Sequence, residues 1–316
     1  MRSPAFRLAL FSVLGALLAP ALTAESRLEK TLKLEPGGSF RLDTDLGSVT
    51  VTGKSTADVQ LVVTSRRELE ELLTFRFDEA PRSVSVTARR KHHFSGWFGD
   101  GGGRLQYEIQ VPAETALTIE TSGGKISIEG IRSRSKLDTS GGGIEVRDLT
   151  GDLEGHTSGG PVKLADIKGR VRVETSGGGI SGVRLNGDVS AETSGGSIDL
   201  ERVAGGIRAS SSGGGIRISE AGGRVEAETS GGSIEASFAK GNGQGGSLET
   251  SGGGIEVAID PDLGFEIDAE GNSVKTDVPV RVVGEVSRRS LRGTLGRGGQ
   301  TLRLHTSGGG VLIRAL

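Results

Sequence analysis

The feature that most constrains this chain is a short motif, Thr-Ser-Gly-Gly or Ser-Ser-Gly-Gly, that returns every 18 residues. Its copies begin at Thr121, Thr139, Thr157, Thr175, Thr193, Ser211 and Thr229. A fixed period of this size is typical of a solenoid, in which each repeat forms one coil and packs only against its neighbours. The 54 glycines among 316 residues would favour disorder if they were scattered, but here they follow the period and indicate order.

Each 18-residue unit divides into two similar halves of nine. Residues 139–156 read TSGGGIEVR and DLTGDLEGH, with glycine at the fourth place of each half and an aliphatic residue at the sixth. Apolar and polar residues then alternate, which is strand periodicity. The aliphatic columns are Ile126, Ile144, Val162, Ile180, Ile198, Ile216 and Ile234 in the first half, and Leu153, Val171, Val189, Ile207 and Val225 in the second.

These columns predict an all-β fold, a parallel β-solenoid or β-helix with 18-residue coils. Each half forms a turn and a short strand, and stacking of the coils buries the aliphatic columns in one continuous core. Glycine suits the corners because tight turns require a positive φ. The Thr and Ser hydroxyls are expected to bond backbone groups at the corners and to stack coil on coil.

The chain is expected to comprise four parts. Residues 1–24 have the layout of a secretory signal peptide, cleaved after Ala24 or, alternatively, after Ala21. Residues 25–120 form a strand-rich N-terminal cap region, residues 121–247 the regular repeats, and residues 248–316 irregular C-terminal coils and a cap. A degenerate coil is expected at Thr44–Val51, a short helical turn within Arg66–Leu73, and a loop insertion at Gly241–Gly246, where the period slips to 21 residues.

The leader predicts an exported protein, located in the periplasm, on the cell surface or in the medium. No cysteine is present, so the fold uses no disulfide. The formal net charge of −2 gives no basic footprint for nucleic acid. No apolar stretch after the leader is long enough to span a membrane.

Three segments together resemble a known family. They are "GSVTVTG" near the start, "YEIQVPAETALTIETSGGKISIEGI" in the middle, and the recurrent "TSGG-x-I" that follows. The combination resembles the bacterial putative adhesin family, a Gly-rich repeat β-solenoid of unknown function, from Leu32 to the C-terminus. The resemblance implies a surface or envelope role and supplies no catalytic residues. The closing "TSGGGVLIRAL" is expected to cap the rod.

No catalytic, cofactor or metal site is predicted. A calcium-binding nonapeptide roll would need acidic ligands where Ile144 and Ile198 stand. His156 and His305 precede corners, where acids usually stand, and are expected to be exposed.

A polysaccharide-active β-helix enzyme is the main alternative, since carboxyl pairs are abundant. Acids of this kind include Glu174, Glu192, Glu228 and Asp199. A deep groove lined by acids, Arg and Lys would favour the enzyme, and flat polar faces would favour binding.

The sequence therefore predicts a non-catalytic, adhesin-like binding or scaffold protein of the envelope. Its partner would be an envelope protein or a surface polymer of unknown identity. A self-associating structural component, joined end to end through the coil ends, is a further option. If one local site contacts the partner, it is expected in the loop Arg89–Arg104, which gathers aromatic residues beside cations. The candidate residues are Arg90, Lys91, Phe94, Trp97 and Phe98. The alternative is that these aromatic side chains cover one end of the solenoid.

Overall fold

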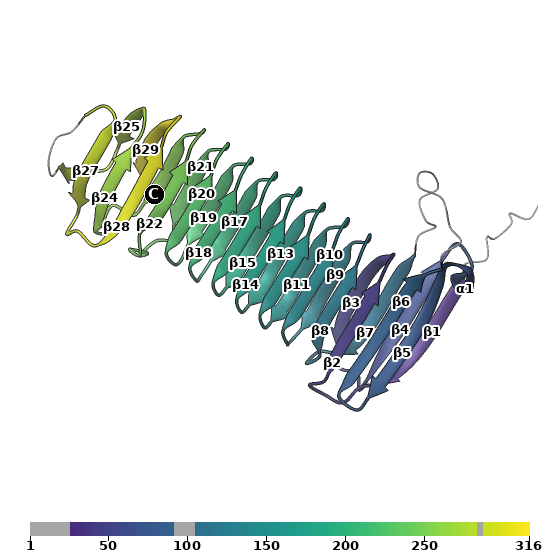
Figure 1. Cartoon of the computed structure of the whole chain (residues 1–316). Helices are drawn as coiled ribbons and strands as arrows, with labels where there is room; N and C mark the ends of the chain where they lie inside the picture. Colours follow the sequence, from purple (N-terminus) through teal and green to yellow (C-terminus); the bar gives the residue numbers. More distant parts are fainter. Residues whose placement is uncertain (1–25, 92–104, 283–286) are drawn as a thin grey trace, which may run out of the picture.

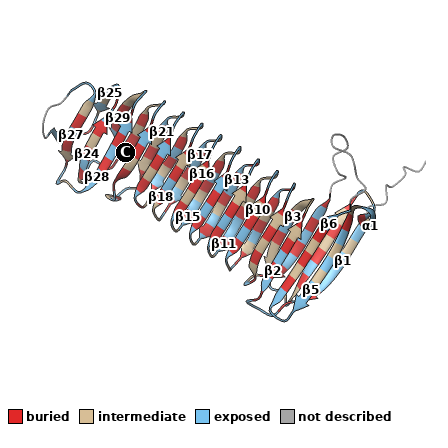
Figure 2. Ribbon diagram, in the orientation of Figure 1, coloured by how far each residue is buried: buried red, intermediate tan, exposed pale blue. Residues whose placement is uncertain are grey.

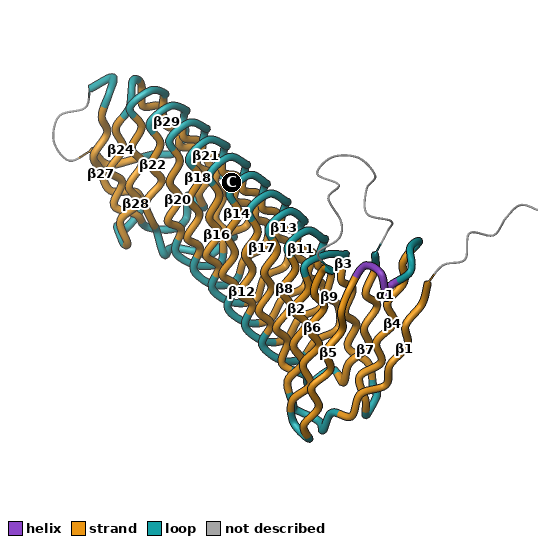
Figure 3. Tube along the Cα trace, turned by 45° about the vertical axis from the view of Figure 1, so that its right-hand side comes forward, coloured by secondary structure: helices purple, strands orange, loops and turns teal. Residues whose placement is uncertain are grey.

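The computed structural model describes residues 26–91, 105–282 and 287–316, which form one elongated rod (Figure 1). Two long β-sheets form the opposite faces of the rod, and the turns line its two long edges (Figure 3). The expected all-β solenoid is confirmed. The one helix among the described residues, α1 (Leu69–Leu72), is the short helical turn expected within Arg66–Leu73.

Within the described residues the first sheet, sheet A, contains fourteen strands. In spatial order they are β1 (Ser26–Lys33), β4 (Asp58–Ser65), β7 (Gln106–Pro112), β3 (Ser48–Lys54), β9 (Ile126–Ile131), β11 (Ile144–Thr150), β13 (Val162–Lys168), β15 (Ile180–Asn186), β17 (Ile198–Val203), β19 (Ile216–Ala221), β21 (Ile234–Phe238), β23 (Ile255–Ile259), β29 (Gly310–Ala315) and β25 (Ser273–Thr276).

The second sheet, sheet B, contains fifteen strands in the same described ranges. In spatial order they are β26 (Val280–Val282), β27 (Ser290–Leu295), β24 (Phe265–Glu270), β28 (Gln300–Thr306), β22 (Gly246–Thr250), β20 (Val225–Thr229), β18 (Ile207–Ser211), β16 (Val189–Thr193), β14 (Val171–Thr175), β12 (Leu153–Thr157), β10 (Ser135–Thr139), β8 (Ala116–Thr121), β2 (Ser39–Thr44), β6 (Ser83–Arg90) and β5 (Leu73–Ala80).

The predicted aliphatic columns form the core. Ile144 lies opposite Val162, Val162 opposite Ile180, and Ile180 opposite Ile198, in parallel pairs of adjacent coils. All four side chains are at most 1% exposed. Figure 2 shows buried residues as continuous bands along the rod. Because every coil contributes to the same band, the core runs from one coil to the next without a break.

The corner hydroxyls are buried and link successive coils. Thr175 Oγ1 donates to the carbonyl of Gly160 in the preceding coil at 2.9 Å and accepts from the N–H of Gly178 in its own corner at 3.2 Å. Ser211 makes the same two bonds, to Gly196 and from Gly214. This confirms the expected role of the hydroxyls. Each one satisfies a donor and an acceptor that the turn leaves without a ladder partner.

The expected positive φ is wrong for the glycines of the Thr-Ser-Gly-Gly corners. Gly142, Gly160 and Gly178 are not among the positive-φ residues. Instead, a Cβ added to Gly178 would lie 2.1 Å from the carbonyl oxygen of Gly160. Glycine is required there because successive coils approach too closely for any side chain. The prediction holds at Gly151 and Gly169, where φ is 146°.

The N-terminal end contains the expected degenerate coil. β2 pairs with β8 and β3 with β9, so Thr44 lies opposite Thr121 and Val49 opposite Ile126. The strands β6 and β7 then add a further coil outside β2 and β3. The edge strands β1 and β5 close this end, where the Glu79 carboxylate accepts from the backbone N–H of Lys33 at 3.1 Å.

The C-terminal end differs from the expectation that the last unit caps the rod. β28 lies between β22 and β24, and β29 lies between β23 and β25, so the final coil is enclosed. The segment from β24 to β27 forms the outer end instead. There the backbone carbonyl of Arg288 accepts a hydrogen bond from the backbone N–H of Val274, in the edge strand β25, at 2.9 Å. The chain thus passes outward and returns, so the returning coil of β28 and β29 lies inside and the strands β25, β26 and β27 lie at the outer end.

The insertion forms a loop between the strands β21 and β22, as expected, and its last glycine, Gly246, is already the first residue of β22. The side-chain amide of Asn242 is buried in it and donates to the carbonyl oxygens of Ala221 at 2.6 Å and Gly223 at 2.9 Å. The backbone N–H of Gln244 donates to the Asn242 side-chain oxygen at 3.0 Å. One side chain therefore supplies the bonds that a regular corner would supply from its backbone.

Candidate functional site: a charged groove along sheet B

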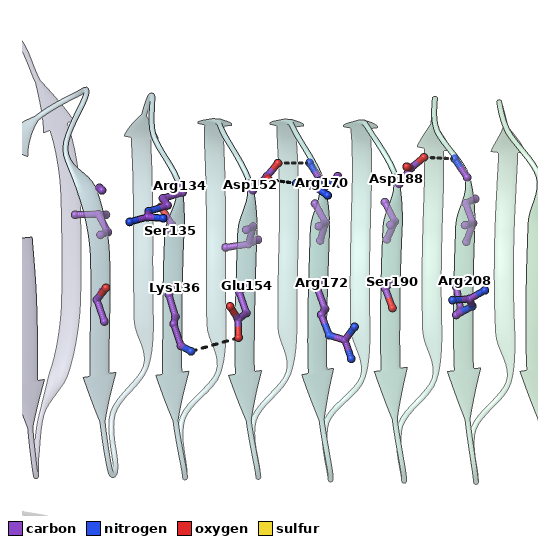
Figure 4. A pocket seen from close by; sticks show the side chains of 18 of the residues that line it. Arg134, Ser135, Lys136, Asp152, Glu154, Arg170, Arg172, Asp188, Ser190 and Arg208 are labelled. Carbon is purple, nitrogen blue, oxygen red and sulfur yellow. Dashed lines mark hydrogen bonds and ion pairs between the residues drawn. The ribbon is translucent and has the colours of Figure 1, made fainter. Parts of the chain in front are cut away.

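A groove of about 840 Å³ runs along the outer face of sheet B, where the strands from β8 to β20 begin. Two rows of side chains line it, and consecutive members of each row come from consecutive coils (Figure 4). The first, the corner row, holds the residue just before each strand: Arg134, Asp152, Arg170, Asp188, Gly206 and Arg224. The second, the strand row, holds the second residue of each strand: Lys136, Glu154, Arg172, Ser190, Arg208 and Glu226.

Parallel register places each row in a line. Lys136 lies opposite Glu154, and Glu154 opposite Arg172, because the strands pair without a shift. Between the two rows stands the inward residue of each strand, such as Val171, whose side chain is buried. The alternation along the strand thus directs one residue into the core and leaves its neighbours on the groove. The 18-residue repeat copies this arrangement in every coil.

The acidic members of the corner row are held by the following coil. Asp152 Oδ1 accepts from the backbone N–H of Arg170 at 3.0 Å, and its Oδ2 pairs with the Arg170 guanidinium at 2.8 Å. These bonds lower the pKa of Asp152, the backbone bond most strongly. Asp188 accepts in the same way from the backbone N–H of Gly206 at 2.8 Å. Each carboxylate therefore points along the rod and fixes the spacing of two coils.

The strand row also carries ion pairs along the rod. Arg208 lies 2.6 Å from Glu226, and this hydrogen-bonded pair lowers the pKa of Glu226. Lys136 Nζ lies 3.4 Å from Glu154. Arg172 reaches an acid only at 4.0 Å, in Glu192. Exposed pairs of this kind contribute little to stability, and their charges stay accessible to a ligand.

Six basic and four acidic residues line the groove, so its surface favours anionic groups. The Arg134 side chain is exposed, and its guanidinium has no hydrogen-bond or ion-pair partner among the described residues. Arginine presents several N–H donors in a planar fork, which suits carboxylate and phosphate groups. The site can therefore bind a ligand that carries anionic groups and lies along the rod.

An acidic row runs beside the groove, two residues further along the strands. It contains Glu120, Asp138, His156, Glu174, Glu192, Ser210 and Glu228. His156 lies 3.8 Å from Glu174, and His305 lies 3.7 Å from Glu270. Both histidine side chains are partly or fully exposed, which confirms the expectation. Asp199 is on sheet A and does not belong to this row. Across the described ranges no three His, Asp or Glu side chains are grouped to hold a metal ion.

Of the predicted loop residues, Arg90 and Lys91 are described, and neither lines the groove. Arg90 ends β6 and Lys91 follows it, at the N-terminal end of the rod. The backbone N–H of Arg90 donates to Asp45 at 2.9 Å, and Lys91 Nζ donates to the carbonyl oxygen of Glu70 at 2.5 Å. The remaining candidates, Phe94, Trp97 and Phe98, lie outside the described residues. The choice between a partner site and an end-cap stays a prediction.

The sequence interpretation missed the groove because it followed the apolar columns and treated the acids as a solvated face. The relevant signal was present. The residues on either side of each second-half aliphatic are charged in most coils, as in "GDLEG" and "GRVRV". Aligning these flanking positions by the 18-residue period would have revealed both rows.

The fold and the groove define the class of protein, a parallel β-solenoid with a charged groove along one face. The chain belongs to the Toastrack DUF4097 family, which it matches over residues 40–314. This agrees with the expected resemblance to a β-solenoid family of unknown function. No curated protein matches the chain. No helix in the described parts is long and apolar enough to cross a membrane.

The chain also matches several solved structures. A putative adhesin from Bacteroides fragilis is 10% identical with a TM-score of 0.42, and the match covers 93% of this chain and 99% of that one. A putative cell adhesion protein from Clostridium sporogenes is 11% identical with a TM-score of 0.28, covering 92% and 100%. A putative lipid binding protein from Parabacteroides distasonis is 12% identical with a TM-score of 0.31, covering 92% and 97%.

Proposed function

We propose that this protein is an exported, non-catalytic, adhesin-like binding or scaffold protein of the bacterial envelope, and that it holds an extended polymer lengthwise in the sheet B groove. The observation that carries the proposal is the pair of in-register charged rows, the corner row and the strand row. A polymer and a solenoid are both repetitive. Coils that present the same charge can therefore make the same contact with successive matching units of one ligand.

The energetics suit this mode of binding. A single exposed cation such as Arg172 gains little from one ion pair in water. Contacts made by consecutive coils share one ordering cost, because binding of the first unit holds the next close to its own site. Weak contacts then add up to useful affinity without a deep pocket. The rigid, continuous core keeps the coils at a fixed spacing, which reduces the cost of ordering the protein side.

Retention of the purified protein on immobilised cell-wall and surface glycans tests the proposal. The wild-type protein should be retained and should release no reducing ends. Arg172→Glu should weaken retention at least tenfold, whereas Arg217→Glu on sheet A, with the same change in charge, should not. Equal retention of both variants would remove the groove from the proposal. Release of reducing ends would show an enzyme.

A polysaccharide-active enzyme is the second candidate, and the charged groove itself is the observation in its favour. Its chemistry would require a carboxylic acid that is protonated near neutral pH. Asp152 and Glu226 have the opposite tendency, since hydrogen bonds from Arg170 and Arg208 lower their pKa values. These groups stay ionised and serve better as fixed charges than as proton donors. The reducing-end assay separates the two candidates.

Export is part of the proposal and rests on the leader-like residues 1–24, which lie outside the described ranges. Fractionation of cells that express the full chain is the test. The protein should be recovered from the periplasm, the surface or the medium, without the leader. Recovery of the full-length precursor from the cytoplasm would contradict export and leave the binding proposal to be judged by the glycan assay.

A further inference from the structure

The charges of the groove alternate from coil to coil. On β10 the two rows present Arg134 and Lys136, and on β14 they present Arg170 and Arg172. The strand between them, β12, presents two acids. The next basic strand is β18, with Arg208, and β16 between β14 and β18 presents Asp188 and an uncharged serine. Cations thus recur on every second coil from β10 to β18, and β20 beyond them presents Arg224 beside Glu226.

This alternation sets a definite spacing between the basic strands. Neighbouring strands lie about 4.8 Å apart, so basic strands recur at about 9.6 Å along the groove. The acids between them are partly committed to the protein, since Asp152 bonds the following coil. They still repel any anion placed against β12, where the Glu154 side chain is 62% exposed. The groove therefore favours anions at two-coil intervals and disfavours an anion at every coil.

From this spacing we propose that the ligand is an extended acidic polysaccharide with one anionic group on every second sugar. The proposal rests on the proposed function and specifies its ligand. A sugar unit in an extended chain is about as long as the coil spacing of ~4.8 Å, so a disaccharide repeat matches two coils. A peptide bound as a β-strand presents side chains to one side at intervals of about 6.6 Å. This interval does not match the spacing of about 9.6 Å between basic strands, so its acidic side chains would miss the cations within a few residues.

Titration of the purified full chain with three octasaccharides tests the assignment. Hyaluronan carries a carboxylate on every second sugar, oligogalacturonate on every sugar, and maltooctaose on none. Hyaluronan should bind at least tenfold more tightly than either of the other two octasaccharides. Raising the salt concentration should weaken hyaluronan binding, because salt screens exposed charges. Equal or tighter binding of oligogalacturonate would contradict the preference for an anion on every second sugar, but it would leave the proposed function intact. Failure of every glycan to bind would overturn both.

Redesign of the charge pattern gives an independent test. Glu154→Lys makes β12 basic, so cations then occupy three consecutive coils. This variant should gain at least tenfold in affinity for oligogalacturonate. Glu235→Lys, an equal change of charge on sheet A, should bind as the wild type does. No gain with Glu154→Lys in a folded protein would contradict the proposal. Arg172→Glu should lose at least tenfold toward hyaluronan, and its side chain is 72% exposed, so the fold should tolerate it.

A peptide ligand is the outcome that would reassign the groove. In a polyproline II chain, a glutamate at every third residue recurs at about 9.3 Å, close to the two-coil spacing. A proline-rich peptide of this design should bind more weakly than hyaluronan. If it binds more tightly, the ligand is a protein segment and the glycan assignment is wrong.

Discussion

At the scale of single residues, the spacing of the coils depends on two side-chain choices at each corner, a glycine and a hydroxyl. Glycine is required where a carbonyl of the preceding coil occupies the place of a side chain. The hydroxyl links the same two coils by two hydrogen bonds. Both requirements can be tested within one corner, because the two neighbouring glycines of a corner differ in how closely the preceding coil approaches them.

Gly178→Ala should be severely destabilising, by about 3 kcal/mol or more, because its Cβ would lie 2.1 Å from the Gly160 carbonyl oxygen and the backbone would have to move. Gly177→Ala is the matched control. Its Cβ would meet the Gly159 oxygen at 3.4 Å, an ordinary contact, and the change should cost less than about 1 kcal/mol. Urea unfolding measures both. Similar midpoints for the two variants would refute the close-approach explanation.

Thr175→Val should cost about 1–3 kcal/mol, because it leaves the buried Gly160 carbonyl and the partly buried Gly178 N–H without their partner. Thr175→Ser keeps the hydroxyl and should behave much like the wild type, as the native Ser211 makes the same pair of bonds. The free energy of unfolding decides the matter. A valine variant as stable as the serine variant would show that the hydroxyl is dispensable.

Tyr107 should make the protein sensitive to alkaline pH. Burial raises the pKa of its phenol to about 12 from an ordinary value of 10.0. The unfolded chain therefore loses the proton first, and stability contributed by the neutral phenol is lost as pH rises from about 10 to 12, on the order of 2–3 kcal/mol. Tyr107→Phe should be less stable than the wild type at pH 8, since it loses the bond to Thr44, but should lose less stability above pH 10. Parallel pH curves for the two proteins would contradict this.

At the scale of the elements, the 18-residue period was sufficient to predict strands, coils and the buried columns. The ladder from Ile144 to Ile198 is a local pattern copied along the chain, so no long-range information was needed. The ends could not be predicted in this way. Whether β28 inserts beneath β24 or stacks outside it depends on pairing with the strands β24 and β27, which carry no repeat motif.

Two further features were not predictable from residue type. Asp148, Asp166, Arg184, Arg202 and Glu220 adopt a positive φ of 47–57°, where glycine would have been expected. Only the first coil places a glycine there, Gly130. A charged residue tolerates this conformation at a modest cost of about 1–2 kcal/mol. The groove was likewise not predicted, because each of its charged residues taken alone is an ordinary surface residue. The residues form two rows only when the parallel register of the strands is known.

Asn242 should be the critical residue of the insertion between β21 and β22. Asn242→Ala removes both bonds to the carbonyl oxygens of Ala221 and Gly223 and should destabilise the protein by about 1–3 kcal/mol. Gly243→Ala is the control in the same loop, since a Cβ there meets no atom within 4 Å. Thermal unfolding monitored by circular dichroism gives both values. Equal effects would show that the loop does not depend on the amide.

At the scale of the whole molecule, the rod joins a repetitive core to a repetitive surface. The same period that stacks the aliphatic columns also aligns the corner row and the strand row on sheet B. The two ends lack this regularity and serve to close the core. A ligand that matches the molecule at this scale must itself be extended, and its affinity must depend on how many coils it reaches.

Affinity as a function of ligand length tests lengthwise binding most directly. The charged rows occupy six strands from β10 to β20, and the first and last strand lie five coil steps, about 24 Å, apart. With one sugar on each strand, the rows accommodate about six sugars. Calorimetric titration with hyaluronan oligosaccharides of increasing length should give a dissociation constant that falls with each added disaccharide up to that length and then levels off. An affinity that is the same for a disaccharide and for a long chain would mean a single local site and would contradict binding along the groove.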